Sequence, residues 1–415
     1  MKTSARVLSP LLWVMLFDHT CLNIAFPVLT LLFFDLQSSL FPPDTSLAVR
    51  SMWYGLCVAI PHVVNIIATP ILSSLSDAYG RKKILLIGTA GAFVFALTAA
   101  LGILYGMLSL VFLGRIIQGA FSRTNPIAQA VVGDVSPKEK KVLYMGYLQS
   151  AIAMGAFIGP LLGGQFANKY FFGTLNFSLP YFVAAGLGAI SFVLTIFFFE
   201  ETLVTKKITS PWQQFSLASL KSLFSKNILQ ISLILLLSQI SWSLYYQFIP
   251  PVLKTFFHFD AKSLGLFVGM VALWLTLASF GLKFLERHYK LEQILLFSMY
   301  LVLIGLLLTS SALLAHSISS ILIWFAAIPT AVGDVMAFSC LIAMYSNVVE
   351  KHEQGKVMGI CFIIIAAIWA LTGLLGGLLL SVNTLLPLLI SPIGIIAAIG
   401  VMKGNLVTHI SEQTI

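Results

Sequence analysis

Four ionisable side chains fall inside long apolar stretches of this 415-residue chain: Asp18, Arg115, Arg123 and Asp334. Charged groups are costly in such stretches and usually mark functional sites. A buried carboxyl group can take up and release a proton, which makes Asp18 the first candidate for proton coupling and Asp334 the second. A simpler alternative is that Asp18 and Arg115 only neutralise each other.

The two arginines lie eight residues apart on one predicted helix. At about 100° per residue they are about 80° apart around the helix axis, so that both can border one cavity. Asn125 and Gln129 extend the polar side of this segment, and Gln118 is also assigned to the cavity. Arginine binds carboxylates in a bidentate manner, and Arg115 together with Arg123 therefore favours an anionic ligand.

An aromatic pair occurs further along the chain, where Trp242 and Tyr246 are separated by one helical turn. Such a pair can stack on a planar or cyclic ligand. Alternatively, the two side chains belong to the aromatic belt that many membrane proteins place at the membrane interface. The sequence leaves both interpretations open.

Several classes of function lack their motifs in this sequence. It contains no HExxH zinc motif, nucleotide-binding loop or Ser/His/Asp arrangement, so neither an enzyme nor an ATP-driven pump is expected. No filter sequence of a channel is visible. The four cysteines fall inside apolar runs without a CxxC pair, which predicts neither a disulfide framework nor a metal site. We expect no bound cofactor.

The stretch 73–83 combines an acid, a glycine and basic residues at fixed spacing, namely Asp77, Gly80, Arg81 and Lys82. Gly80 allows a tight turn with positive φ. Asp77 can accept hydrogen bonds from the free backbone N–H groups at a helix N-terminus. Arg81 can pair with a carboxylate across the inner face of the membrane.

This stretch resembles the G-x-L-x-D-x-x-G-R-[RK] loop signature of the major facilitator superfamily, with Ser73 in place of the first glycine. The resemblance implies a loop between spans 2 and 3 that holds the two halves of a carrier together on the cytoplasmic side. Asp134, which follows the fourth predicted span, is grouped with this gating loop. The resemblance also implies that spans 1, 4, 7 and 10 line a central cavity, which would place Asp18, Arg115, Arg123 and Asp334 around one pathway.

Two further motifs support the resemblance. The segment 114–119 resembles the family's R-x-x-Q-G element, which implies a role for Arg115 in proton coupling or substrate contact. The segment 155–164 resembles the G-x-x-x-G-P-x-x-G-G signature of proton-coupled drug exporters, and its small residues let a neighbouring helix approach closely. Its signature residues are Gly155, Gly159, Pro160, Gly163 and Gly164. The N-terminal half, with 198–202 after span 6, is similar to tetracycline/proton antiporters.

The composition requires a membrane environment. Hydrophobic residues make up 59% of the chain and charged residues 9%, against roughly 25% charged residues in soluble domains. The mean hydropathy is +0.97. One crossing needs about 20 apolar residues. Twelve helical spans are predicted near 8–34, 52–75, 84–105, 107–131, 143–168, 179–199, 228–252, 263–283, 291–315, 318–345, 357–381 and 384–402.

Basic residues are distributed unevenly among the predicted loops. With a cytoplasmic N-terminus, the inner loops hold 18 of the 24 lysines and arginines. This asymmetry predicts that both termini are cytoplasmic, and we expect a bacterial inner membrane. The polar stretch 203–227 separates six spans in 1–202 from six in 228–415, and sequence matches at an offset of about 213 residues indicate an internal repeat. The expected fold is all-α, with two pseudo-symmetric six-helix halves.

These features predict a secondary carrier that moves a small organic solute by alternating access, driven by protons and exporting by antiport. The alternative is a proton-coupled importer of an anionic metabolite, such as a polycarboxylate or a carboxylate siderophore. Arg123 supports this alternative, because the tetracycline exporters have small residues at that place. We expect a small-molecule substrate, the lipid bilayer as surroundings, a monomer, and no nucleic-acid partner.

Overall fold

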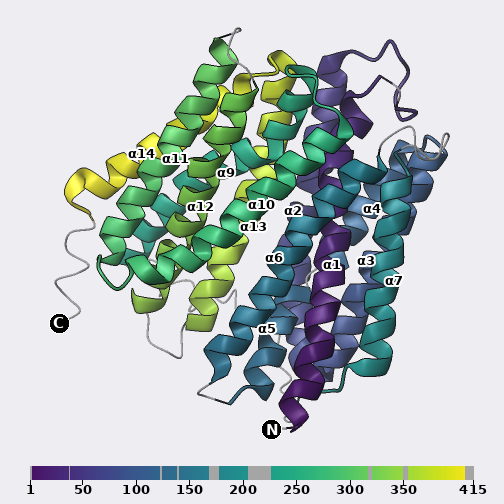
Figure 1. Cartoon of the computed structure of the whole chain (residues 1–415), viewed down its shortest axis with the longest axis vertical. Coiled ribbons are helices and arrows are strands. Elements are labelled where there is room, and N and C mark those ends of the chain that lie inside the picture. The colour runs from purple at the N-terminus through teal and green to yellow at the C-terminus, as the bar shows by residue number, and fades with distance from the viewer. Residues whose placement is uncertain are drawn as a thin grey trace. The chain divides into compact units, whose positions relative to one another are not determined.

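The computed structural model describes residues 2–36, 38–121, 124–137, 140–167, 177–203, 226–315, 320–348 and 354–406, and in these ranges it contains helices and no strands (Figure 1). The first helices are α1 (Lys2–Phe34), α2 (Leu47–Tyr79), α3 (Arg81–Leu104), α4 (Leu108–Phe121), α5 (Thr124–Val135), α6 (Lys141–Phe166) and α7 (Leu179–Phe198). They are followed by α9 (Lys226–Thr255), α10 (Ala261–Leu285), α11 (Leu291–Leu314), α12 (Ile321–Val348), α13 (Gln354–Val382) and α14 (Leu386–Val401), with a π-helical turn at Met402–Leu406.

Eleven of these helices are long and apolar enough to cross a membrane. Each coincides with one of the predicted spans, so those eleven positions are confirmed. The remaining prediction, near 107–131, corresponds to α4 and α5, which have 14 and 12 residues. Residues 122 and 123, which separate them, lie outside the described part of the chain, and Arg123 is therefore not placed.

The chain divides into two compact units. Unit 1 comprises Met1–Pro211 and Leu253–Leu273, and unit 2 comprises Trp212–Val252 and Trp274–Ile415. The division passes through α9 and α10, so that the end of α9 and the start of α10 group with the N-terminal helices. The two units therefore differ from a simple cut at the 203–227 linker only in residues 253–273, which group with unit 1.

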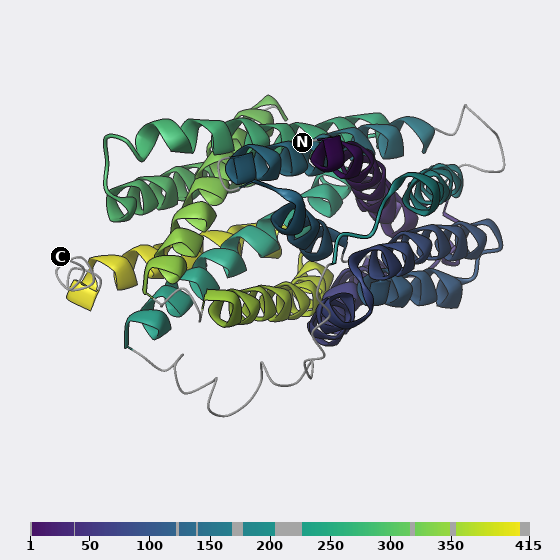
Figure 2. The ribbon, with the colours of Figure 1, turned by 90° about the horizontal axis from the view of Figure 1, so that it is seen from below.

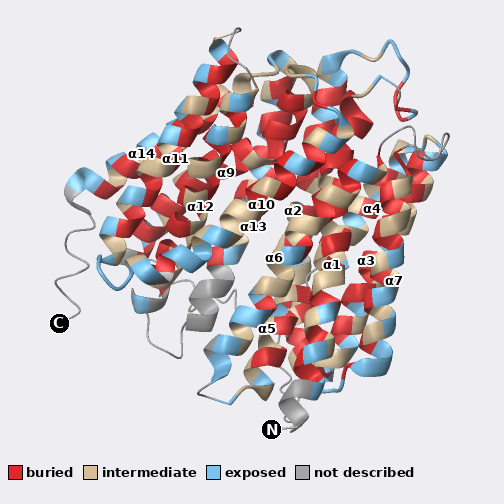
Figure 3. Ribbon diagram, in the orientation of Figure 1, coloured by how far each residue is buried: buried red, intermediate tan, exposed pale blue. Residues whose placement is uncertain are grey.

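In unit 1, α1 packs against α6 and α7, and α3 packs against α4 and α7 (Figures 1 and 2). In unit 2, α11 packs against α12 and α14. Two thirds of the most apolar 18-residue segment of α1 is buried, against about one fifth of the corresponding segment of α6. The buried residues of α1 are red in Figure 3. The N-terminal helix is therefore a central element of its unit, which places Asp18 in the interior.

Hydroxyl side chains inside the helices bond back to the preceding turn. Thr20 donates to the carbonyl of Leu16 at 2.7 Å, and Thr89 donates to that of Leu85 at 3.0 Å. Because the hydrocarbon region offers no water, a polar side chain there must find a partner within the protein. Local bonds of this kind let serines and threonines occupy apolar helices without a partner on another helix.

A buried arginine organises the connection between α1 and α2. Arg50, only 3% exposed, donates to the backbone carbonyls of Phe33, Pro42 and Thr45 at 3.3, 3.0 and 3.2 Å. Its guanidinium also lies 5.3 Å from the centre of the Phe41 ring. The side chain thus gathers the end of α1 and the following loop around the start of α2. Next to these contacts, Lys254 Nζ pairs with Asp35 Oδ2 at 2.7 Å.

The glycines of the 155–164 signature lie against two different neighbours. A Cβ atom on Gly155, Gly159 or Gly163 would approach atoms of α1 to 2.8, 2.8 and 2.4 Å. A Cβ atom on Gly164 would lie 2.4 Å from the carbonyl oxygen of Ala261 in α10. Real Cβ atoms do not tolerate such distances, so α6 can approach both helices only because these positions lack side chains.

We predict that Gly159→Leu destabilises the protein, because the added side chain must push α6 away from α1. Overpacking of this kind costs about 1–3 kcal/mol. Gly186→Leu in α7 is the matched control, since nothing lies within 4 Å of a Cβ atom built there. Thermal unfolding of both purified variants in detergent measures the difference. Equal melting temperatures would show that the α1–α6 contact does not depend on Gly159.

Candidate functional site

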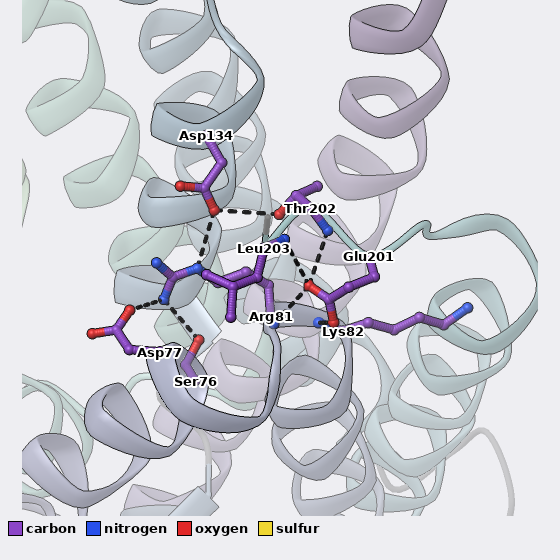
Figure 4. A network of polar contacts seen from close by, with 8 residues as sticks. All are labelled: Ser76, Asp77, Arg81, Lys82, Asp134, Glu201, Thr202 and Leu203. Atoms are coloured by element: carbon purple, nitrogen blue, oxygen red, sulfur yellow. Dashed lines mark hydrogen bonds and ion pairs between the residues drawn. The ribbon is translucent and has the colours of Figure 1, made fainter. Parts of the chain in front are cut away.

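The turn between α2 and α3 carries a network of charged groups, which we term the turn network (Figure 4). Arg81 is its centre: Nη1 lies 2.6 Å from Asp77 Oδ1, and Nε donates to Asp134 Oδ2 at 3.1 Å. Nη1 also donates to the Ser76 hydroxyl at 3.0 Å. Arg81 thus pairs with a carboxylate, as predicted, and its partners are Asp77 of the same turn and Asp134 at the end of α5.

Glu201, just after α7, completes the turn network from the other side. Its Oε1 accepts hydrogen bonds from the backbone N–H groups of Arg81, Thr202 and Leu203 at 2.9, 2.9 and 3.0 Å. Its Oε2 accepts from the N–H of Lys82 at 3.1 Å. The carboxylate therefore occupies the N-terminus of α3, where free N–H groups and the helix dipole favour a negative charge.

The expectation that Asp77 caps a helix N-terminus is wrong. Asp77 lies in the last turn of α2, four residues before Arg81, and this spacing directs its carboxylate to the Arg81 side chain. Glu201 takes the capping role instead. Gly80, with a φ of 114°, makes room for it, because a Cβ atom there would overlap the Glu201 carboxylate.

A second polar contact lies deep in unit 1. The Thr124 hydroxyl, at the start of α5, donates to Asp18 Oδ2 at 2.5 Å. Asp18 is fully buried at the middle of α1, and its Oδ1 has no hydrogen-bond partner among the described residues. One carboxyl oxygen of Asp18 is therefore held by a hydrogen bond, and the other is not bonded to any described residue.

Asp18 and Arg115 do not neutralise each other, because no ion pair joins them in the described part of the chain. Arg115 donates through Nε to the backbone carbonyl of Cys57 in α2 at 2.9 Å and through Nη1 to the side chain of Gln118. It points to α2, whereas Asp18 faces the start of α5. Asn125, also predicted, accepts from Gln129 at 3.0 Å.

The predicted residues of unit 2 lie on different helices. Asp334 is 8% exposed at the middle of α12, and none of the ion pairs in the described ranges involves it. Trp242 and Tyr246 stack on each other in α9, with ring centroids 5.3 Å apart. Trp242 is the 17th of the 30 residues of α9, which is too deep for an interfacial belt.

Glu201 and Thr124, which hold the two sites together, were not among the sequence-based candidates. Glu201 had a signal, since 198–202 was part of the resemblance to the antiporters. Thr124 had none, because 106 residues separate it from Asp18 and threonines are frequent in apolar helices. Its role follows only from the packing of α5 on α1.

Comparisons with known proteins agree with this geometry. The family described as the Major Facilitator Superfamily matches residues 8–374. The chain is 27% identical over 384 residues to the tetracycline resistance protein, class H, of Pasteurella multocida, covering 89% of this chain and 87% of that protein. It is 32% identical over 167 residues to the multidrug resistance protein MdtG of Proteus mirabilis, covering 40% of this chain and 39% of the relative. The crystal structure of a D-xylose-proton symporter superposes with a TM-score of 0.74 at 15% identity, covering 97% of both chains, and shows the shared fold.

We predict that Glu201→Ala loosens the N-terminus of α3. Loss of a capping side chain costs about 1 kcal/mol, which corresponds to roughly fivefold faster amide hydrogen exchange. The amides of Arg81 and Lys82 should respond most, because they donate directly to Glu201. Glu200→Ala is the control, since the neighbouring Glu200 is exposed. Unchanged exchange at Arg81 and Lys82 in Glu201→Ala would contradict the capping role.

Proposed function

This chain belongs to the Major Facilitator Superfamily, and on that basis we propose that it is a proton-coupled carrier that exports a small organic solute by antiport. It is a multi-pass membrane protein and a transporter, and its relatives include drug exporters. Proton coupling, export and the solute are the proposed part. The relatives named for tetracycline resistance and multidrug resistance support export, as does the 155–164 signature.

The observation that carries proton coupling is the Asp18–Thr124 contact. Asp18 lies at the middle of a spanning helix, one carboxyl oxygen is held by Thr124, and the other has no partner among the described residues. Polar groups at this depth are kept for function, because they are costly in hydrocarbon. A carboxyl group of this kind can bind a proton from one side and release it to the other when the cavity reopens.

Thr124, the first residue of α5, couples this carboxyl group to that helix. When Asp18 gains or loses its proton, the hydrogen bond to Thr124 must change, and the start of α5 must adjust. The turn network includes Asp134 near the end of the same helix, α5. We propose that α5 transmits the state of Asp18 to the turn network, which closes the cytoplasmic side.

The proposed setting is the bacterial inner membrane, with both termini in the cytoplasm. It rests on the excess of lysine and arginine in one set of loops. We propose a monomer that needs no bound cofactor and draws its energy from the proton gradient. Its partners are the small-molecule solute and the surrounding lipid.

We predict that Asp18→Asn abolishes gradient-driven transport, because asparagine keeps the size and polarity of the side chain but carries no exchangeable carboxyl proton. Inside-out vesicles with an imposed pH gradient and tetracycline as the first probe measure the flux. Flux should fall to that of vesicles without the protein, while equilibrium binding of the probe persists. Asp44→Asn, at an exposed loop position, is the control. Normal gradient-driven flux in Asp18→Asn would refute the assignment.

Transport direction and the charge of the solute separate export from the alternative, a proton-coupled importer of an anionic metabolite. Arg123 is the sequence feature that favours the importer. We predict that Arg123→Ala weakens binding of anionic probes more than of cationic ones, since a guanidinium attracts the former and repels the latter. Gradient-driven accumulation of an anion in right-side-out vesicles, and none in inside-out vesicles, would overturn the export proposal.

A further inference from the structure

A third aromatic ring joins the Trp242–Tyr246 pair in unit 2. The Trp369 ring of α13 lies with its centroid 6.0 Å from that of Tyr246, at an interplanar angle of 56°. The stack along α9 therefore continues onto a second helix. Trp242, Tyr246 and Trp369 thus form a cluster from two helices that sequence spacing within α9 does not reveal, and the fully buried Tyr245 also contacts Trp242, with ring centroids 5.9 Å apart.

Two amide side chains hold Trp369 in place. Its indole Nε1–H donates to Gln239 Oε1 at 3.2 Å, and its backbone carbonyl accepts from Gln247 Nε2 at 3.3 Å. Gln247 Nε2 also donates to the Thr372 hydroxyl at 3.2 Å. Both glutamines are buried, with exposed fractions of 4% and 0%. The cluster is thus fixed by hydrogen bonds before any ligand arrives, which reduces the entropy lost on binding.

The cluster lies at the depth of a solute site. Trp242 is the 17th of 30 residues in α9, and Trp369 is the 16th of 29 in α13. Carriers bind their substrates near the middle of the membrane. Aromatic belts lie at the ends of spans instead. Polar side chains such as the two glutamines are also rare beside lipid and usually face the interior of the protein.

The exposure of the three rings differs in a way that suits stacking. Trp242 is 6% exposed and forms the base, whereas Tyr246 and Trp369 are partly exposed. Aromatic faces prefer offset-stacked or edge-on contacts with other aromatic rings. The exposed part of this cluster therefore offers a planar ligand a selective contact that a saturated ring of the same size cannot make.

We propose that Trp242, Tyr246 and Trp369 form an aromatic platform that binds a planar aromatic ring of the transported solute, with Trp369 as a specificity-determining residue. Because the platform names the ligand class of the proposed carrier, it depends on that function. The experiment therefore measures equilibrium binding without a proton gradient, so that a failure of transport and a failure of the platform are distinguishable.

The test uses matched probes with the purified full chain in detergent. One pair is 2-naphthoate and decahydro-2-naphthoate, and the other is 2-naphthylmethylammonium and its decahydro counterpart. Members of a pair share the carbon skeleton and charge but differ in planarity, and comparison of the pairs reports the charge that the site accepts. Equilibrium dialysis gives each affinity for the wild type, Trp369→Leu, Trp369→Phe and the control Trp13→Leu, whose tryptophan is 54% exposed on α1.

We expect the wild type to bind the planar member of at least one pair about fivefold more tightly than the saturated member, in line with typical aromatic pair energies. Trp369→Leu should remove this preference, while Trp369→Phe and Trp13→Leu retain it. Tyr246→Leu and Tyr246→Phe repeat the comparison if a Trp369 variant does not fold. Equal binding of both members by the wild type, no binding of any probe, or an intact preference in Trp369→Leu would each overturn the platform. An intact preference in a protein without gradient-driven flux would refute only the proposed transport.

Discussion

The hydrocarbon core of a membrane offers no water to polar groups, and the structure of this protein follows from that constraint. Backbone groups are satisfied within helices, and many hydroxyl side chains of the described helices bond to the preceding turn, as Thr20 does with Leu16. Side chains without such a local solution need a partner on another helix. Asp18 with Thr124 and Trp369 with Gln239 are two examples, and both join residues more than 100 positions apart. Polar contacts between helices also occur outside the candidate sites, as between Tyr345 and Ser232, but those of Asp18 and Trp369 lie at the middle of their helices.

Close helix packing makes these contacts possible. The glycine row of α6 brings that helix against α1, and α1 in turn holds Asp18 against the start of α5. In membranes, association between helices depends on packing and hydrogen bonds, since lipid tails are as apolar as leucine. The glycines of the 155–164 signature thus contribute to the Asp18 site indirectly, because they set the position of α1.

The turn network and the mid-membrane residues suit the two tasks of a carrier. At the α2–α3 turn, one arginine and one glutamate tie together the end of α2, the start of α3, the end of α5 and the segment after α7. Such a network can hold one arrangement of helices and release it when a charge changes. At the middle of their helices, Asp18 in unit 1 and the aromatic platform in unit 2 are the proposed proton-binding group and solute-binding surface. Alternating access requires both kinds of element.

The sequence by itself determined the elements of this protein. Long apolar runs located the spans, and the Asp77–Lys82 motif indicated the family and a carboxylate partner for Arg81. It did not determine which helix faces meet. Apolar residues occur on every side of these helices, so the pattern does not mark the inward face. The sequence offered an ion pair between Asp18 and Arg115 and gave no sign of the contact with Thr124. Glu201 as the cap of α3 and Trp369 beside Tyr246 likewise depend on how distant helices pack. Only the tertiary structure decided these partners, because a bilayer drives apolar segments to form helices but leaves their mutual orientation to side-chain packing.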